Sequence, residues 1–240
     1  WYCEHIAATN PCAEQPLPPY GACLLGSFNL VKYINKDAEA GFDVSFFEKD
    51  IEVVVRAMDN VVDRAIFTLQ KQEGEAHSKR RMGLGITGLA NAGEVLGYPY
   101  GSLSFLGFEK FILRLLNERC YSASADIAVE KGSFPLFKMD KYLLSKFVQT
   151  LDCKDKIANQ CIRNSHLTSN ATTGTISMAA DNISSGIEPV FALKQTRTVR
   201  MPDGDRQVEF DDYGYRVWGV KGKTSDAVTA KEHLDVLSTA

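Results

Sequence analysis

The sequence of 240 residues lacks features that mark several protein classes. No signal-peptide pattern is visible in it, and no apolar run approaches the roughly 18 residues that a membrane-spanning helix needs. Its six cysteines are too sparse for a disulfide-stapled secreted protein, and they include no C-x-x-C pair and no cysteine–histidine cluster with zinc spacing. The sequence therefore predicts no membrane association and no bound metal, and a reducing cytoplasm is the expected compartment.

An excess of charge of one sign is also absent. The chain has 27 Lys and Arg against 30 Asp and Glu, which gives a net charge of −3. This balance provides no electrostatic case for a nucleic-acid surface. With 45% hydrophobic and 24% charged residues, the composition is that of a globular protein. Because the chain starts at Trp1 and stops at Ala240 inside a predicted helix, we expect it to be a piece of a longer protein.

Hydrophobic periodicity predicts several helices. A long amphipathic helix is expected over residues 46–70, after a capping box formed by Ser45 and Glu48. Residues 71–80 are polar and basic, and a glycine-punctuated apolar helix is expected over residues 85–96. A third helix is expected from near Leu106 to Gly132.

The second half of the chain reads differently. One or two short helices are expected over residues 140–160, and strand, tight loop and helix start over residues 161–193. A hairpin is expected over residues 196–210, around Pro202-Asp203-Gly204. A capping box of Thr229 and Glu232 opens the last helix.

The first candidate site is Asn10-x-Cys12-x-Glu14, in a segment where half of the eight prolines lie. Proline disfavours helix, so we expect residues 10–22 to be extended, with Asn10, Cys12 and Glu14 on one face. A thiol can act as nucleophile or hydrogen-atom donor, a carboxylate as general base, and an amide can hold either partner. Taken alone, the pattern is weak and is better interpreted as a half-buried cysteine in a loop.

Two further cysteines, Cys23 and Cys120, are interpreted from their sequence context. Cys23 follows Cys12 by eleven residues, and Pro18-Pro19-Tyr20-Gly21 between them can fold the chain back. On its own, Cys23 is better read as a buried cysteine. Cys120 lies on the apolar stripe of a helix and is expected in the core.

A third candidate is the Thr/Gly/Ser-rich loop from Ala171 to Ser177. A loop that opens a helix presents free backbone amides, which suit a phosphate, although a capped helix start is the alternative. The loop lacks the lysine and spacing of a Walker A motif. The nearby segment Ser184–Pro189 is expected to shape this site by packing. Residues 83–88 do not fit the dinucleotide fingerprint G-x-G-x-x-G, so we interpret their glycines as close helix packing.

Together these segments resemble the large, catalytic subunit of ribonucleotide reductase. Residues 10–27 (NPCAEQPLPPYGACLLGS) resemble its finger-loop segment, residues 80–90 (RRMGLGITGLA) a second family block, and residues 171–177 with 184–189 a third. The blocks occur in family order. Ala13 and Thr172 depart from the family pattern, since glycine and proline are common at those positions.

The resemblance implies a fold and a reaction. The fold is α/β, part of a ten-stranded α/β barrel with a central finger loop, of which residues 1–240 would form the C-terminal part as a single, incomplete domain. The reaction is reduction of ribonucleotides, with diphosphates expected, to 2′-deoxyribonucleotides. Cys12 matches the thiyl radical residue, Glu14 the general base, Asn10 the substrate-binding amide and Cys23 one member of the reducing cysteine pair. The residues that match the phosphate loop are Thr172, Thr173, Gly174, Thr175, Ile176 and Ser177.

The resemblance also implies partners. The wording of residues 10–23 is most similar to the adenosylcobalamin-dependent class, so adenosylcobalamin is the expected cofactor. The alternative is the class that uses a separate metal-containing small subunit. A glycyl-radical enzyme and a non-catalytic nucleotide-binding fragment are alternatives from other classes. A thioredoxin- or glutaredoxin-like reductant and the missing N-terminal part of the same subunit are expected partners, and a homodimer is an option. The isolated chain is expected to be inactive.

Overall fold

A computed structural model describes residues 5–35 and 41–240. The chain divides into two compact units with interleaved segments. Unit 1 comprises Trp1–Gly26, Val44–Gly85 and Leu113–Ala171, and unit 2 comprises Ser27–Asp43, Ile86–Ile112 and Thr172–Ala240. The prediction that the whole chain is one incomplete domain stays a prediction.

Two helices dominate unit 1, namely α1 (Val44–Arg64) and the part of α4 (Leu103–Lys131) that begins at Leu113. Two ion pairs join them, between Glu48 and Arg119 at 2.6 Å and between Arg56 and Glu130 at 2.6 Å. Because the residue numbers rise together in the two pairs, the helices contact each other with the same sense of chain direction. The apolar stripe of α1 is buried, as its helical spacing predicts: Phe47, Ile51, Val55, Met58 and Val62.

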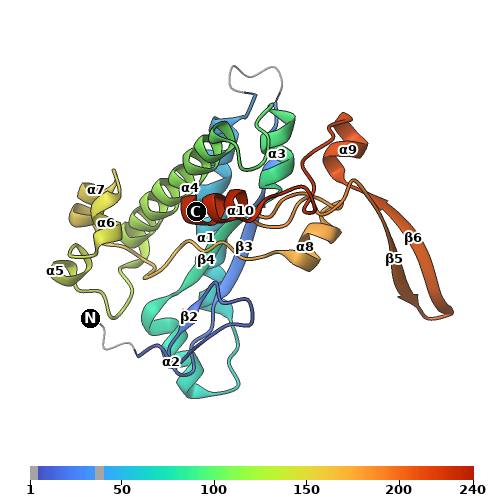
Figure 1. The fold of residues 1–240 in the computed structure, drawn as a ribbon. Coiled ribbons are helices and arrows are strands. Elements are labelled where there is room, and N and C mark those ends of the chain that lie inside the picture. Colours follow the sequence, from blue (N-terminus) through green and yellow to red (C-terminus); the bar gives the residue numbers. More distant parts are fainter. Residues whose placement is uncertain (1–4, 36–40) are drawn as a thin grey trace. The chain divides into compact units, whose positions relative to one another are not determined.

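Unit 1 also contains shorter elements (Figure 1). These are β1 (Ala8–Thr9), β2 (Pro16–Leu17), α2 (Gln70–Lys79), α5 (Met139–Tyr142), α6 (Lys146–Thr150) and α7 (Lys154–Gln160). The short helices over residues 140–160 were expected, but three form rather than one or two. The helix α2 was not expected, because its ten residues are almost entirely polar.

The strands β3 (Leu24–Asn29) and β4 (Met82–Thr87) pair in a two-stranded sheet. Every residue of β4 is buried. Because residues 82–87 form a strand, the prediction of a helix that begins at Gly85 is wrong for residues 85–87, and so is the interpretation of Gly83 and Gly85 as helix-packing residues. Residues 166–169 run alongside β4, with Leu84 bridged in parallel to Thr168. A Cβ on Gly85 would lie 2.2 Å from the carbonyl oxygen of Ser169. Glycine therefore serves the close approach of another backbone segment.

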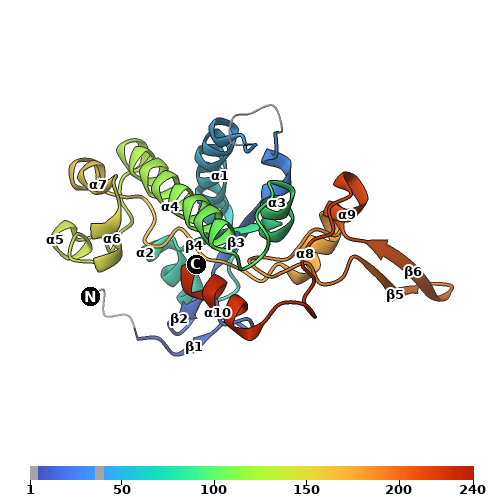
Figure 2. The ribbon, with the colours of Figure 1, turned by 45° about the horizontal axis from the view of Figure 1, so that its top comes forward.

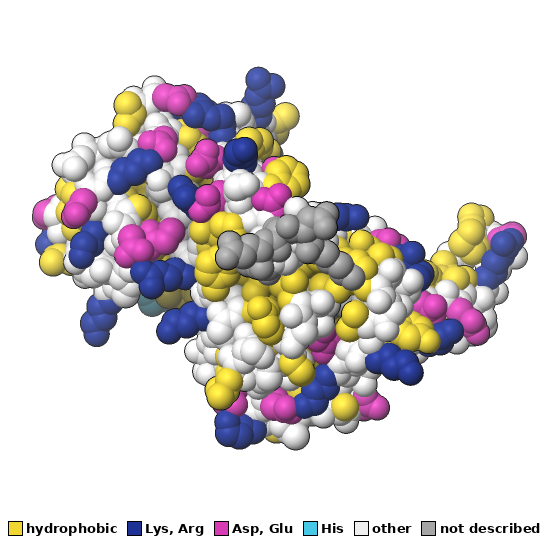
Figure 3. All heavy atoms as spheres, turned by 90° about the horizontal axis from the view of Figure 1, so that it is seen from above, with side chains coloured by type: hydrophobic (Ala, Val, Ile, Leu, Met, Phe, Trp, Pro, Cys, Tyr) yellow, Lys and Arg dark blue, Asp and Glu magenta, His cyan; other side chains and the backbone are white. Residues whose placement is uncertain are grey.

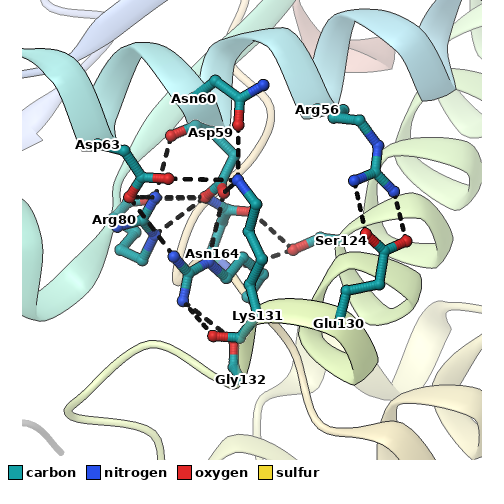
Figure 4. A network of polar contacts seen from close by, with 11 residues as sticks. Arg56, Asp59, Asn60, Asp63, Arg80, Ser124, Glu130, Lys131, Gly132 and Asn164 are labelled. Atoms are coloured by element: carbon teal, nitrogen blue, oxygen red, sulfur yellow. Dashed lines mark hydrogen bonds and ion pairs between the residues drawn. The ribbon is translucent and has the colours of Figure 1, made fainter.

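A buried polar network centres on Asp59 of α1 (Figure 4), whose side chain is 0% exposed. Its Oδ1 accepts hydrogen bonds from Arg80 Nε at 2.9 Å, Arg80 Nη2 at 2.7 Å and Asn164 Nδ2 at 3.0 Å. Its Oδ2 lies 3.3 Å from both Lys131 Nζ and Arg163 Nε. One carboxylate thus ties together α1, the end of α2, the end of α4 and residues 163–164.

Unit 2 contains the short helices η1 (Leu30–Tyr33), α3 (Leu89–Val95), α8 (Gly174–Ala179), α9 (Tyr213–Trp218) and α10 (Ala230–Thr239). Val31, Ile183 and Tyr213 form a small apolar cluster there. Asn91 of α3 donates to both carboxylate oxygens of Asp212 at 3.0 Å, which anchors the start of α9. The capping box of Thr229 and Glu232 at α10 is confirmed.

The predicted hairpin is also confirmed. It is formed by β5 (Lys194–Met201) and β6 (Gly204–Asp211) and extends from the rest of unit 2 as a two-stranded arm (Figure 1).

The two long helices were predicted from the sequence, and α1 and α4 form close to the expected ranges. The capping box at Ser45 is wrong, because α1 begins one residue earlier, at Val44. Cys120 is buried, as expected.

The expected ten-stranded barrel is seen only in part. The described residues are α/β, but their strands form three separate two-stranded sheets and no closed barrel.

No helix in the described part of the chain is both long and apolar enough to cross a membrane. On the face drawn in Figure 3, basic and acidic side chains are interspersed, in keeping with the near-neutral charge balance.

Candidate active site

The Asn10–Glu14 motif lies at the tip of a small hairpin in unit 1. The strands β1 and β2 pair antiparallel, with Ala8 opposite Leu17 and Thr9 opposite Pro16. Asn10 closes the loop between them, because its amide N–H donates to the carbonyl of Gln15 at 3.2 Å and its side-chain Oδ1 accepts from the amide of Gln15 at 3.0 Å. The structure therefore gives Asn10 a local role in shaping the loop that carries Cys12 and Glu14.

The expected extended conformation of residues 10–22 is wrong at this loop. Residues 11–14 form a turn, in which the amide of Ala13 donates to the carbonyl of Asn10 at 3.0 Å. Ala13 has a φ of +64°, a left-handed conformation that favours glycine. The turn, rather than strand alternation, brings Asn10, Cys12 and Glu14 to one tip.

Cys12 and Glu14 occupy different environments on this tip. Cys12 is a free, exposed thiol. The backbone carbonyl of Glu14 accepts a hydrogen bond from Ser169 Oγ at 3.0 Å, which fixes the loop against residues 166–169. The Oε2 atom of Glu14 is buried and has no hydrogen-bond partner among the described residues. A buried acceptor without a partner is costly, so this oxygen is suited to accept a hydrogen bond from a bound hydroxyl.

Cys23 is half-buried in unit 1, in a cavity of about 180 Å³ whose walls include Val62, Phe67 and Arg81. Burial raises the pKa of its thiol to about 11, an effect that Arg81 opposes and the nearby charge of Glu14 reinforces. Cys23 is therefore a neutral thiol at pH 7. The charge of Glu14 therefore acts on the thiol of Cys23, and the role of Cys23 stays a prediction.

The predicted phosphate loop lies in unit 2, at the start of α8. Thr173 is buried and has a φ of +50°, which is unusual for a β-branched residue. Its Oγ1 accepts from the amide of Gly186 at 2.8 Å and lies 2.9 Å from Oγ1 of Thr87, which donates to the carbonyl of Ser184 at 3.2 Å. This buried chain of hydrogen bonds holds the strained residue in place.

The side chains of this loop divide into two groups. Thr173 and Ser177 are buried, and Ser177 Oγ donates to the carbonyl of Gly174 at 3.0 Å, so both hydroxyls are used within the fold. The exposed members are Thr172, Gly174, Thr175 and Ile176. The amides of Gly174, Thr175 and Ile176 belong to the first turn of α8, where an amide has no intrahelical acceptor. The exposed group offers its backbone amides to a ligand directly.

Two functional candidates in unit 2 were not predicted from the sequence. Thr87 was read as part of a glycine-rich helix, although it supports Thr173 across 86 residues of sequence. Arg197 lines a cavity of about 370 Å³ together with Gly174 and Ser177 of the loop. The alternation of β5 predicts which face Arg197 shares, but no local signal places that face beside α8. Among the described residues, no group of three or more His, Cys, Asp or Glu side chains is placed to hold a metal ion.

Comparison with known proteins agrees with the motif reading. Residues 1–212 match the family model of the ribonucleotide reductase barrel domain. A vitamin B12-dependent ribonucleoside-diphosphate reductase of Mycobacterium tuberculosis (strain H37Rv) is 35% identical over 194 residues, which cover 81% of this chain and 25% of that protein. The protein of the same name from Thermoplasma acidophilum is also 35% identical over 194 residues, covering 81% of this chain and 23% of its own.

A relative with a different name matches a shorter part of the chain. The ribonucleoside-diphosphate reductase subunit alpha of Chlamydia trachomatis is 30% identical over 141 residues, covering 57% of this chain and 13% of that protein. The chain spans about a quarter of the length of the B12-dependent relatives named above. With the family model matched over most of its length, the chain belongs to the ribonucleotide reductase family.

Proposed function

We propose that the protein reduces ribonucleotides, as diphosphates, to 2′-deoxyribonucleotides by a thiyl-radical mechanism. The observation that carries the proposal is the hairpin tip of unit 1, where an exposed thiol and a carboxylate with an unpartnered buried oxygen share one tight turn. The names of the B12-dependent relatives support the same reaction.

Each residue of the tip has a distinct role in this proposal. Cys12, as a thiyl radical, abstracts the 3′-hydrogen of the ribose, for which its exposure is suited. Glu14 accepts the proton of the 3′-hydroxyl at its unpartnered Oε2. Asn10 keeps the turn closed through Gln15, so that the thiol and the carboxylate stay on the same side of the substrate.

The reduction needs two electrons. The 2′-hydroxyl leaves as water when two thiols supply two hydrogens and become a disulfide, so atoms and electrons balance. We assign Cys23 as one of these thiols, because a neutral thiol near Glu14 can give a hydrogen to the ribose. We place the second thiol in the part of the protein outside this chain. A thioredoxin- or glutaredoxin-like dithiol then regenerates the pair.

The loop Thr172–Ser177 is proposed to bind the substrate phosphates. Its exposed members, among them Gly174 and Thr175, offer amides and a hydroxyl, while Thr173 and Ser177 act through the shape of the loop. The replacement of the family proline by Thr172 leaves these amide donors in place.

Adenosylcobalamin is the proposed source of the radical, following the names of the B12-dependent relatives. When bound, it supplies a carbon radical by cleavage of its carbon–cobalt bond. Cys12 is an exposed thiol and could therefore give up a hydrogen atom to such a radical. We assign no residue of this chain to the binding of the cobalamin.

The test is formation of dCDP from CDP by the full-length protein with a dithiol reductant, with and without adenosylcobalamin. Turnover that requires the cobalamin supports both the reaction and the radical source. Turnover that instead requires an added metal-containing small subunit retains the roles of Cys12, Glu14 and Cys23 and overturns the cofactor assignment. No turnover under either condition contradicts the proposal.

Two variants separate the reductase from a nucleotide-binding module. Cys12→Ser is expected to abolish turnover while nucleotide affinity is retained. Cys153→Ser removes another free thiol of unit 1, which is half-buried, and is the control that is expected to leave turnover unchanged. Residual turnover in Cys12→Ser would contradict the role of Cys12.

A further inference from the structure

The cavity of about 370 Å³ in unit 2 is the starting point. It lies between α8, the loop that follows α8 and the base of the β5–β6 hairpin, which Figures 1 and 2 show next to α8. Two of its lining residues, Gly174 and Ser177, belong to the proposed phosphate loop. The proposed loop from Thr172 to Ser177 contains no Lys or Arg, although a nucleoside diphosphate carries several negative charges.

Arg197 of β5 provides a cation in this cavity. Its Nε donates to Oε1 of Gln195 at 3.0 Å and its Nη2 to Oδ1 of Asn182 at 3.3 Å, and the guanidinium lies 5.4 Å from the ring centre of Phe210. All three neighbours are neutral, and no ion pair of Arg197 occurs in residues 5–35 and 41–240. A guanidinium has five N–H donors, so these contacts orient it and leave donors for an anion.

Asp212 is the other ionisable side chain in the cavity wall. Both of its carboxylate oxygens accept from Asn91 Nδ2 at 3.0 Å, and Oδ2 also accepts from the amide of Tyr215 at 3.1 Å. These donors engage the carboxylate within the fold, and burial raises its pKa. Asp212 therefore does not neutralise Arg197 by direct contact.

We infer that Arg197 contacts the phosphates of the bound ribonucleotide from the side of the hairpin, opposite the amides of the loop. This rests on the proposed function and adds to it a cationic residue for substrate recognition. A planar guanidinium can bind two phosphate oxygens at once, and such charge-assisted bonds are stronger than neutral ones. The side chain is already held by Gln195 and Asn182, so little rotamer freedom is lost on binding.

The experiment compares Arg197→Gln with Arg200→Gln in the full-length protein. Arg200 lies on the same strand, faces the opposite side of the hairpin and is exposed, which makes it a matched control for loss of one positive charge. Dissociation constants for CDP, cytidine and inorganic pyrophosphate are measured by calorimetry, and KM and kcat for CDP reduction by turnover. Circular dichroism checks that each variant is folded.

Arg197→Gln is expected to weaken CDP and pyrophosphate binding about tenfold or more, raise KM for CDP equally, and leave cytidine binding and kcat nearly unchanged. Arg197→Lys should recover part of the affinity, and Arg200→Gln should change neither constant more than twofold. Equal losses in both glutamine variants, or CDP binding unchanged in Arg197→Gln, would overturn the inference. Failure of the wild-type protein to bind or reduce CDP would instead contradict the proposed function.

Discussion

At the scale of single residues, Glu109 of α4 stands apart from the other carboxylates of unit 2. Its side chain is 0% exposed, and neither carboxylate oxygen has a hydrogen-bond partner among the described residues. Burial alone raises its pKa to about 8. Glu109 is therefore mainly a neutral acid at pH 7, which avoids the cost of an unpaired buried charge.

Glu109→Gln is predicted to stabilise the protein at alkaline pH. The folded-state pKa lies above the ordinary value of 4.5, so the stability linked to the neutral acid is complete below pH 4.5 and is lost as the pH rises to about 8. Glutamine cannot ionise, so at pH 8.5 the variant should have a free energy of unfolding about 2–5 kcal/mol above wild type. Thermal unfolding of both proteins at pH 5 and 8.5 measures this.

The pH dependence distinguishes ionisation from simple packing. The two proteins should differ little at pH 5, where both side chains are neutral. Glu130→Gln is the control, because Glu130 is exposed and paired with Arg56. A constant difference between Glu109→Gln and wild type at both pH values would show that Glu109 does not titrate in this range.

At the scale of elements, the Asp59 network joins segments that local sequence does not connect. Asp59→Ala is predicted to cost about 3–5 kcal/mol of unfolding free energy, because it leaves the buried guanidinium of Arg80 without its main acceptor. The matched control is Arg56→Ala, which removes an exposed ion pair of the same helix and should cost less than about 1 kcal/mol. Chemical denaturation measures both, and similar costs would contradict the central role of Asp59.

The same scale shows which elements a sequence can predict. The helix α1 and the hairpin β5–β6 follow from periodicity and a turn signal, because each has a distinct apolar or exposed face. The helix α4 follows from a long run of apolar residues at helical spacing that ends at Gly132. The strand β4 does not alternate, since it is buried on both sides, and its glycines imitate a packed helix. The helix α2 carries no apolar stripe that could reveal it.

For the candidate site, the sequence predicts the identity of the residues but not their geometry. Asn10, Cys12, Glu14 and Cys23 could be selected from sequence because their chemistry and order resemble a family motif. Their geometry could not, since a turn with Ala13 at positive φ replaces the expected extended chain. The supporting contacts of the phosphate loop were also hidden, because Thr87 meets Thr173 only through tertiary packing.

At the scale of the whole molecule, the chain matches only part of the length of its relatives. It spans about a quarter of its B12-dependent relatives, and its described strands form pairs rather than a closed barrel. Unit 1 carries the candidate radical and reducing cysteines, and unit 2 carries the proposed phosphate loop. In the proposed reaction both units contact one substrate, and we propose that the second reducing thiol comes from a segment outside this chain.

The last prediction follows from this division. Residues 1–240 alone should form no measurable dCDP from CDP with dithiol and adenosylcobalamin, whereas the full-length protein should turn over. The isolated chain should still bind CDP weakly, because the loop Thr172–Ser177 and Arg197 both lie in unit 2, and Arg197→Gln should remove that binding. Turnover by the isolated chain would contradict the assignment of the second reducing thiol to another segment. Loss of both turnover and CDP binding would instead mean that the phosphate site of unit 2 forms only when the rest of the full-length protein is present. The missing segments would then be a condition for substrate binding as well as for chemistry.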